Sequence, residues 1–176
     1  MQKRKFTTRE ISYLAMITAT CVVGRFAFQW IPNFQPMTAI FLLFTRYFGF
    51  WRGMIVNVLA LVITNFYFGM GIWTIEQILS FGIVLLLFRI CCISSIFRSW
   101  LPLQIIVSIF AGFCYGFSIS LMDSYVYGLP NFWVYYAQGV SFDFLHAVGN
   151  GIFYTILSPV FHYLMKVKAS KDKYYS

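Results

Sequence analysis

The chain has 176 residues, of which 60% are hydrophobic and only 10% are charged, and its formal net charge is +8. A soluble domain is usually about 25% charged, so this composition argues against an ordinary soluble enzyme or a nucleic-acid-binding domain. Long apolar runs instead indicate a lipid bilayer. We predict an all-α integral membrane protein that forms one compact bundle over residues 1–176, with no nucleic-acid partner.

Six apolar segments follow one another along the chain, and each is predicted to be a transmembrane helix. They cover residues 11–30, 38–50, 53–68, 73–88, 102–125 and 132–165. The second segment is short, and the sixth is long enough to tilt or to extend out of the membrane. Pro159 in the sixth segment predicts a kink or the start of a cytoplasmic extension.

The basic residues are distributed unevenly around these segments. All Lys and Arg residues except Arg25 precede the first segment, flank the connections after the second and fourth segments, or follow the sixth. Cytoplasmic connections carry the excess of Lys and Arg in membrane proteins. We therefore predict both termini in the cytoplasm, with a basic N-terminus at 1–10 and a basic tail at 166–176, and hence an even number of spans.

Polar residues gather in the halves of the segments that would lie on the outer side. An ionisable residue inside a bilayer is costly and usually faces a cavity or a partner. Arg25 lies in the outer part of the first segment, and Glu76 lies just inside the fourth. Asp143, His146 and Asn150 have offsets of 0, 3 and 7, which place them along one face of the sixth helix.

The connection over residues 31–37 is predicted to cover an outward-facing pocket. Its two prolines, Pro32 and Pro36, stop a helix and favour a rigid, extended path. Its amide side chains offer hydrogen-bond donors and acceptors. The predicted substrate-binding residues are Arg25, Asn33, Gln35, Trp73, Glu76, Asp143, His146 and Asn150.

A structural interpretation of the same residues remains open. Arg25 either meets the ligand or forms an ion pair with Glu76 or Asp143. Polar side chains on one helix face also form hydrogen bonds between helices. Outer aromatic residues such as Trp73 are typical of the belt at a membrane surface.

Catalytic and nucleotide-binding motifs are absent from the sequence. There is no phosphate-binding loop, no HExxH and no GxSxG. The four cysteines are scattered, and we interpret them as small apolar residues. Because the chain has only two histidines besides, no metal site is expected. The chain is predicted to be a binder or carrier rather than an enzyme. Two alternatives remain, namely a small membrane enzyme that uses Asp143 and His146 for acid–base chemistry, and a structural assembly subunit.

The first segment contains Ala15 and Ala19, whose spacing lets two helices approach closely, and Gly112 and Gly116 repeat this spacing in the fifth. With six segments, both ends inside and no ATPase motif, the chain resembles the substrate-binding S-components of energy-coupling-factor (ECF) vitamin transporters. These are multi-pass proteins of the bacterial cell membrane. The resemblance implies that Ala15 and Ala19 dock on a transmembrane coupling subunit.

The resemblance has further implications for mechanism and substrate. Two partner ATPase subunits would use ATP and Mg, the chain itself would bind no cofactor, and it would topple in the membrane to deliver a vitamin. The stretches IPNFQPMTAI and FDFLHAVGNGIFY resemble the branch that includes the cobalamin carrier of lactobacilli. Cobalamin (vitamin B12) is therefore the expected substrate. Other substrates remain open: folate, pantothenate, riboflavin, thiamine, biotin, or a pyrimidine or queuosine precursor.

Overall fold

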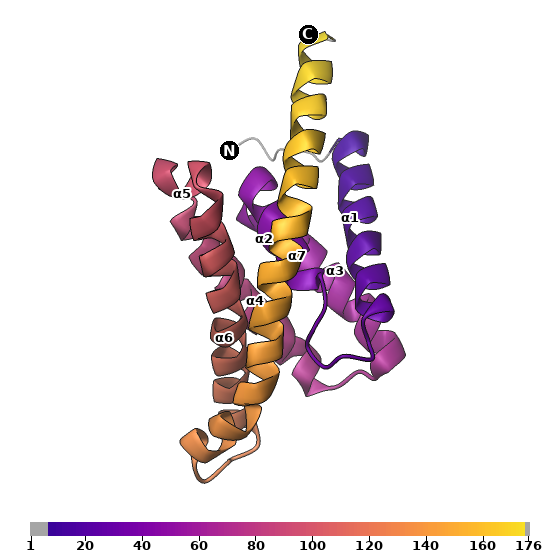
Figure 1. Ribbon diagram of the computed structural model, residues 1–176. Helices are drawn as coiled ribbons and strands as arrows, with labels where there is room; N and C mark the ends of the chain where they lie inside the picture. The colour runs from indigo at the N-terminus through magenta and orange to yellow at the C-terminus, as the bar shows by residue number, and fades with distance from the viewer. Residues whose placement is uncertain (1–6, 175–176) are drawn as a thin grey trace, which may run out of the picture.

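A computed structural model describes residues 7–174 of the chain, apart from the side chains of residues 169 and 171–174. The basic residues expected at positions 3–5, and the side chains of Lys171 and Lys173, lie outside the described residues. The described part is all-helical (Figure 1), and its helices in chain order are α1 (Thr8–Ala27), α2 (Met37–Phe48), α3 (Phe50–Phe68), α4 (Ile72–Cys91), α5 (Ser95–Ser99), α6 (Leu101–Val126) and α7 (Phe132–Tyr174).

Five of these helices, α1, α3, α4, α6 and α7, are long and apolar enough to cross a membrane. The predicted segments coincide with α1, α3, α4 and α6 to within three residues, whereas α7 begins at the predicted residue and ends nine residues later. The second predicted segment is a helix of only 12 residues, α2. No helix was predicted at α5, which is a single short turn. The Ser94 hydroxyl caps it by accepting a hydrogen bond from the N–H of Phe97.

The start of α1 is fixed by a reciprocal capping box. The Thr7 hydroxyl accepts a hydrogen bond from the backbone N–H of Glu10 at 3.2 Å, and the Glu10 carboxylate accepts from the N–H of Thr7 at 3.1 Å. Each side chain thereby satisfies an N–H group that has no partner inside the helix. The helix therefore begins at Thr8, three residues before the predicted segment.

Helix α2 lies at the centre of the bundle. Every residue from Met37 to Thr45 is buried, so the helix is covered on all sides. A helix that is apolar all round is stable only when other elements surround it. Helices α1, α3, α4 and α7 all contact α2, and together they surround it. The core of the protein is built around this short helix.

Helices α6 and α7 form the most extensive helix pair and lie side by side along their length (Figure 1). Gly112 and Gly116 of α6 face α7. A Cβ atom at Gly112 would lie 2.7 Å from the backbone nitrogen of Ala147, and one at Gly116 would overlap the carboxylate of Asp143. The small residues of α6 therefore serve packing inside this chain.

Helix α7 is 43 residues long, or about 65 Å at 1.5 Å per residue. This is about twice the thickness of the apolar core of a bilayer. The helix continues through Pro159 without a break, and its last part projects beyond the other helices (Figure 1). That this part leaves the membrane on the cytoplasmic side stays a prediction.

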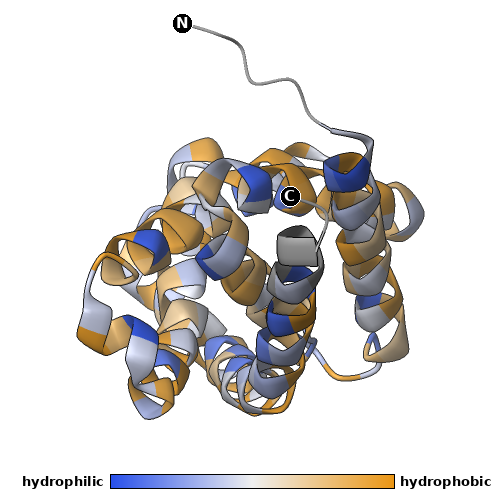
Figure 2. Ribbon diagram, turned by 90° about the horizontal axis from the view of Figure 1, so that it is seen from above, coloured by the Kyte–Doolittle hydropathy of each residue, from blue (hydrophilic) through white to orange (hydrophobic). Residues whose placement is uncertain are grey.

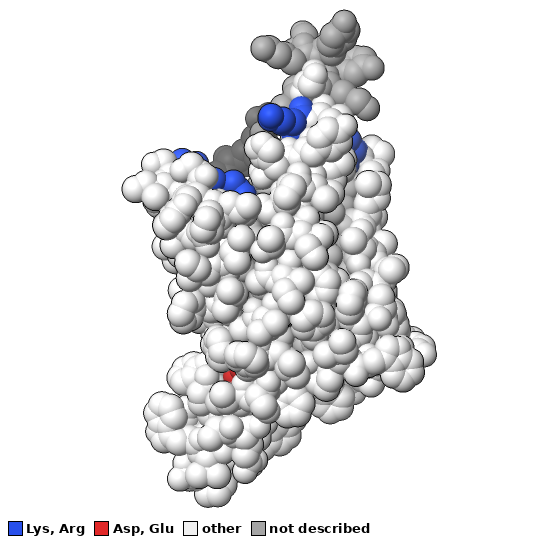
Figure 3. Space-filling model, in the orientation of Figure 1, with Lys and Arg blue, Asp and Glu red and all other residues white. Residues whose placement is uncertain are grey.

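One end of the bundle is basic. Arg46 donates to the backbone carbonyl of Arg98 at 2.7 Å, Arg52 forms an ion pair with Glu10, and Lys168 lies over the ring of Phe48. These contacts join four parts of the chain that are far apart in sequence. On the face drawn in Figure 3, the blue Lys and Arg atoms lie at the upper end only. Arg25, in the last turn of α1, lies at the opposite end.

The outside of the bundle is apolar. Large hydrophobic side chains are exposed on every long helix, and Val23, Trp51, Phe66 and Phe110 are more than half exposed. In the view along the bundle, orange residues face outward on most helices and blue residues are scattered among them (Figure 2). In water such a surface would aggregate, whereas in a bilayer it meets lipid chains.

The α6–α7 contact predicts a position-specific effect of adding one methyl group. Replacing Gly112 with Ala forces α7 away from α6, because the new Cβ meets the α7 backbone, and should destabilise the protein by about 1–3 kcal/mol. Gly139→Ala is the matched control, since a Cβ there meets nothing within 4 Å. Thermal unfolding of the purified protein in detergent measures both. Equal midpoints for the two variants would contradict the packing described here.

Candidate functional site

A cavity of about 190 Å³ opens at the end of the bundle opposite the basic residues. It lies between the last turn of α1, the end of α3 and the connection from α1 to α2. Three residues predicted to bind substrate, Arg25, Asn33 and Gln35, lie together in its wall. The rest of the wall consists of Phe28, Gln29, Ile31, Pro32 and Phe68.

Arg25 is held by neutral polar groups of α3. Its Nη1 atom donates to Thr64 Oγ1 and, at 2.8 Å, to Asn65 Oδ1, and its guanidinium lies 5.3 Å from the centre of the Phe68 ring. Within the described residues it forms no ion pair with Glu76 or Asp143, so the expected pairing is wrong. Arg25 braces α1 against α3 and at the same time faces the cavity.

Asn65 extends this brace to α4. Its Nδ2 atom donates to Thr74 Oγ1 at 3.0 Å and to Gln77 Oε1 at 2.7 Å. Three helices are thus joined by one chain of side-chain hydrogen bonds at the end of the bundle opposite the basic residues. Thr64, Asn65 and Gln77 were not among the predicted site residues. The signal available for them was their position as polar residues near the ends of apolar segments.

The connection between α1 and α2 packs into the bundle. The rings of Phe28 and Phe34 lie 5.0 Å and 5.3 Å from the ring of Phe153 on α7, centre to centre, and Pro36 packs against Gly24. The connection therefore fills the space at the start of α2. It is part of the core as well as a cover for the cavity.

The extended path expected for this connection is wrong. Its backbone forms successive turns, in which Ile31 donates to the carbonyl of Phe28 and Phe34 to that of Ile31. Asn33 has a φ of 56°, a left-handed conformation that asparagine tolerates better than most residues. Backbone groups away from water need partners inside the chain, and the turns provide some of them where an extended strand would not.

Asp143, His146 and Asn150 lie on the buried face of α7, as their spacing predicts. The Nε2 atom of His146 lies 2.7 Å from Thr38 Oγ1 at the start of α2, so the two groups share a hydrogen bond. The ring of Tyr115 meets the His146 ring edge to face, with centres 5.1 Å apart. This face of α7 therefore looks toward α2 and α6.

Several polar atoms in this half of the bundle have no hydrogen-bond partner among the described residues. Glu76 is 3% exposed and Asn150 is fully buried, yet neither oxygen of Glu76 and neither side-chain polar atom of Asn150 has a partner. The same holds for Asp143 Oδ2 and His146 Nδ1. A buried polar group without a partner costs about 1–3 kcal/mol, and more when it is charged. Such a cluster is typical of a site that is completed by a ligand.

One buried amide at the basic end is, by contrast, well paired. Gln104 accepts hydrogen bonds from Arg46 and from the hydroxyl of Tyr154, and donates to the backbone carbonyl of Phe97 at 2.7 Å. Unpaired buried atoms also occur at this end, on Thr45 and Tyr47. What distinguishes the half near Arg25 is that carboxyl and amide groups, those of Glu76 and Asn150, are left without any partner.

Two other predicted groups lie away from this cluster. Trp73 is 44% exposed, and its ring covers Gly71, so it does not line the cavity or the face of α7. Ala15 and Ala19 are exposed on the outer face of α1, where they leave a shallow strip between larger side chains such as Ile11 and Val23. That strip is available to a partner helix.

The described residues contain no group of three His, Cys, Asp or Glu side chains that could hold a metal ion, and the four cysteines are free. No protein-family model matches the chain, and neither the curated proteins nor the solved structures contain a detectable match. The chemistry of the site therefore rests on its residues. Asn33 and Gln35 offer amides in the wall of the cavity, whereas Glu76, Asp143, His146 and Asn150 are buried in the same half of the bundle and do not line it. Together these groups suit a ligand that donates and accepts hydrogen bonds.

If Asn150 is buried without partners, an apolar side chain of similar size should be tolerated there. We expect Asn150→Leu to leave the free energy of unfolding unchanged or to raise it by about 1 kcal/mol, because an unpaired amide is removed from the core. Gln104→Leu is the control and should destabilise by about 2–4 kcal/mol, because it leaves the partners of Gln104 unpaired. Thermal unfolding in detergent without added ligand measures both. A strong destabilisation by Asn150→Leu would show that this amide has partners.

Proposed function

We propose that this protein is the substrate-binding subunit, or S-component, of an ECF-type vitamin importer in a bacterial cell membrane. The observation that carries the proposal is the cluster of buried, unpartnered polar atoms on Glu76, Asp143, His146 and Asn150. It occupies the end of the bundle opposite the basic residues. A binding protein keeps such groups because its ligand supplies the missing partners.

The orientation follows from the charges. With the basic end in the cytoplasm, the cavity beside Arg25 faces the outside, where a nutrient is captured. Both termini are then cytoplasmic, and the chain passes the membrane six times, with α2 and the connection before it together forming one pass.

The ligand is best described as neutral or weakly charged, and rich in amide groups. Asn33, Gln35 and Asn150 offer both donors and acceptors, and Glu76 and Asp143 offer acceptors for N–H groups. Cobalamin has several amide groups around its ring and is our best candidate. Folate, riboflavin, pantothenate and the other vitamin precursors remain the alternatives within the same class.

Energy comes from partners in this proposal. The chain has no phosphate-binding loop, so ATP and Mg are used by two ATPase subunits that act through a transmembrane coupling subunit. The exposed strip of Ala15 and Ala19 on α1 supports this assignment, because small residues let a partner helix approach closely. Toppling of the whole subunit would then carry the site to the cytoplasm.

A vitamin-binding panel tests the proposed substrate class. The purified chain should retain cobalamin, or another vitamin of the panel, in equilibrium dialysis. Asn150→Leu should weaken that binding at least tenfold, since roughly 1.4 kcal/mol of hydrogen bonding is lost. Gln138→Leu, an exposed site on the same helix, should leave binding unchanged. Retention of no vitamin, or equal effects of the two variants, would reject the proposal.

The partner strip is tested separately. Replacing both Ala15 and Ala19 with Trp should abolish vitamin uptake by cells that express the complete transporter, because the bulky rings keep a partner helix away. Vitamin binding by the isolated double variant should stay within about twofold of the original. Ile83→Trp with Leu87→Trp, an exposed pair on α4 with the same spacing, is the control and should leave uptake intact. Normal uptake by the alanine variant would exclude docking at this strip.

A further inference from the structure

A cavity of about 360 Å³ lies at the basic end of the bundle, opposite the proposed substrate site. Its wall is formed by the end of α2, by α5 and the start of α6, and by α7. Arg46 of α2, Arg98 of α5 and His162 of α7 are the basic side chains of this wall. We call it the basic cavity.

The two arginines of the basic cavity carry charge that no carboxylate balances within the described part of the chain. Arg46 donates to Gln104 Oε1 and to the backbone carbonyl of Arg98, both at 2.7 Å, and these acceptors are neutral. The two bonds hold the guanidinium in place and leave other N–H groups of it able to donate. The side chain of Arg98 forms no hydrogen bond with any described residue.

A third arginine adds to the positive charge at this corner of the bundle. Arg89 in the last turn of α4, Arg46 and Arg98 all lie near enough to the Cys92 sulfur to interact with it electrostatically. Arginines from three helices therefore converge here. A cavity beside such a group attracts an anion.

An apolar groove of about 470 Å³ lies between α6 and α7. Ile105 and Ile109 of α6 line this groove, and Leu101, four residues before Ile105, lines the basic cavity. On α7, Ile152 lines the groove, and Pro159, seven residues later, lines the cavity. Residues four or seven apart share one face of a helix. The groove and the cavity therefore follow one another along the same face of the helix pair.

The groove has the length and the exposure that suit an acyl chain. From Val148 to Ile156 it follows about 12 Å of α7, at 1.5 Å per residue. One leaflet contributes about 15 Å to the apolar core of a bilayer. Ile152 and Ile156 are 44% and 60% exposed, so the groove opens on the outer surface of the bundle.

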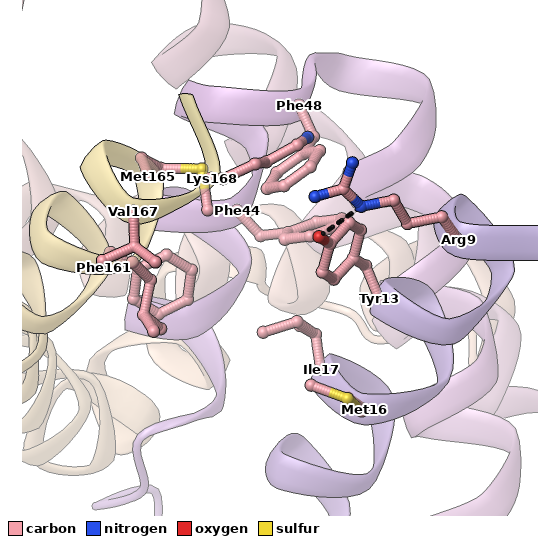
Figure 4. Close-up of a pocket in the computed structure, with 11 residues that line it drawn as sticks. Arg9, Tyr13, Met16, Ile17, Phe44, Phe48, Phe161, Met165, Val167 and Lys168 are labelled. Carbon is pink, nitrogen blue, oxygen red and sulfur yellow. Dashed lines mark hydrogen bonds between the residues drawn. The ribbon is translucent and has the colours of Figure 1, made fainter. Parts of the chain in front are cut away.

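Another cavity at the basic end, of about 240 Å³, lies between α1, α2 and α7 (Figure 4). Its cations have partners within the chain. The Nε atom of Arg9 donates to the Tyr13 hydroxyl at 3.0 Å, and the Lys168 ammonium lies 4.6 Å from the centre of the Phe48 ring. This second cavity supplies a control cation for the test below.

We propose that the groove between α6 and α7 holds an acyl chain of one anionic phospholipid, whose phosphate binds Arg46 and Arg98. A planar guanidinium matches the oxygens of a phosphate, and basic residues at a membrane surface are the chemistry that anionic head groups recognise. A free phosphate would leave the apolar groove empty, and a neutral lipid would leave the arginines unbalanced. An anionic phospholipid fits both parts.

The experiment is native mass spectrometry of the purified chain in micelles with equal amounts of dioleoyl phosphatidylglycerol and dioleoyl phosphatidylcholine. The wild-type chain should retain one phosphatidylglycerol and prefer it about fivefold or more. Arg98→Gln should reduce this preference about fivefold, the effect of one basic residue near a membrane surface. Arg98→Lys should largely restore it. Lys168→Gln is the control, since Lys168 lies outside the basic cavity and the groove, and should leave the preference unchanged.

The acyl chain is tested by blocking the groove. Ile152→Trp should reduce retention of phosphatidylglycerol several-fold, whereas Ile106→Trp, at a similarly exposed site outside the groove, should not. Excess inorganic phosphate should displace no lipid, because it lacks the chain that occupies the groove. Equal retention of the two lipids, equal effects of Arg98→Gln and Lys168→Gln, or displacement by phosphate would overturn the proposal. So would a photo-crosslinker at position 156 that captures a second copy of the chain instead of lipid.

Discussion

Helix α2 is too short to cross a bilayer, and most of the architecture follows from this. Its 12 residues span about 18 Å, whereas the apolar core of a membrane is about 30 Å thick. The chain that leads into α2 must therefore enter the bundle, where its backbone closes turns and its phenyl rings pack on α7. Helices α1, α3, α4 and α7 surround α2. The cavity beside Arg25 is walled by this connection, because no helix occupies that position at the end of the bundle.

The two ends of the bundle pair their buried amide groups differently. Around Gln104 each amide atom has partners, and Arg46 joins it to the carbonyl of Arg98. Around Asn150 and Glu76 the carboxyl and amide atoms are buried and unpaired. A fold that pairs the Gln104 amide so fully does not leave the Asn150 amide unpaired through lack of suitable residues. The candidate site is therefore defined by missing hydrogen bonds, in a chain where no catalytic motif marks it.

Local patterns predicted the helices and one face of the site, because apolar runs and the spacing of Asp143, His146 and Asn150 depend only on helix geometry. They did not predict which helices are neighbours. An ion pair of Arg25 with Glu76 or Asp143 was one of two alternatives, yet Thr64 and Asn65 of α3 lie beside it. The same limit applies to small residues. Gly112 and Gly116 have the spacing of Ala15 and Ala19, but the glycines are used inside the chain and the alanines are exposed.

The packing of Phe28 and Phe34 against Phe153 has a consequence for the timing of ligand exchange. Both rings are half-buried, so moving each from the bundle into water would cost less than the roughly 1.5–3 kcal/mol of a fully buried ring. The cover of the cavity is thus held by ring contacts with α7, and opening it breaks these contacts. A ligand enclosed beneath it would leave at a rate set by that opening, even if its own contacts were weak. Residence time and affinity are then governed by different residues of the same protein.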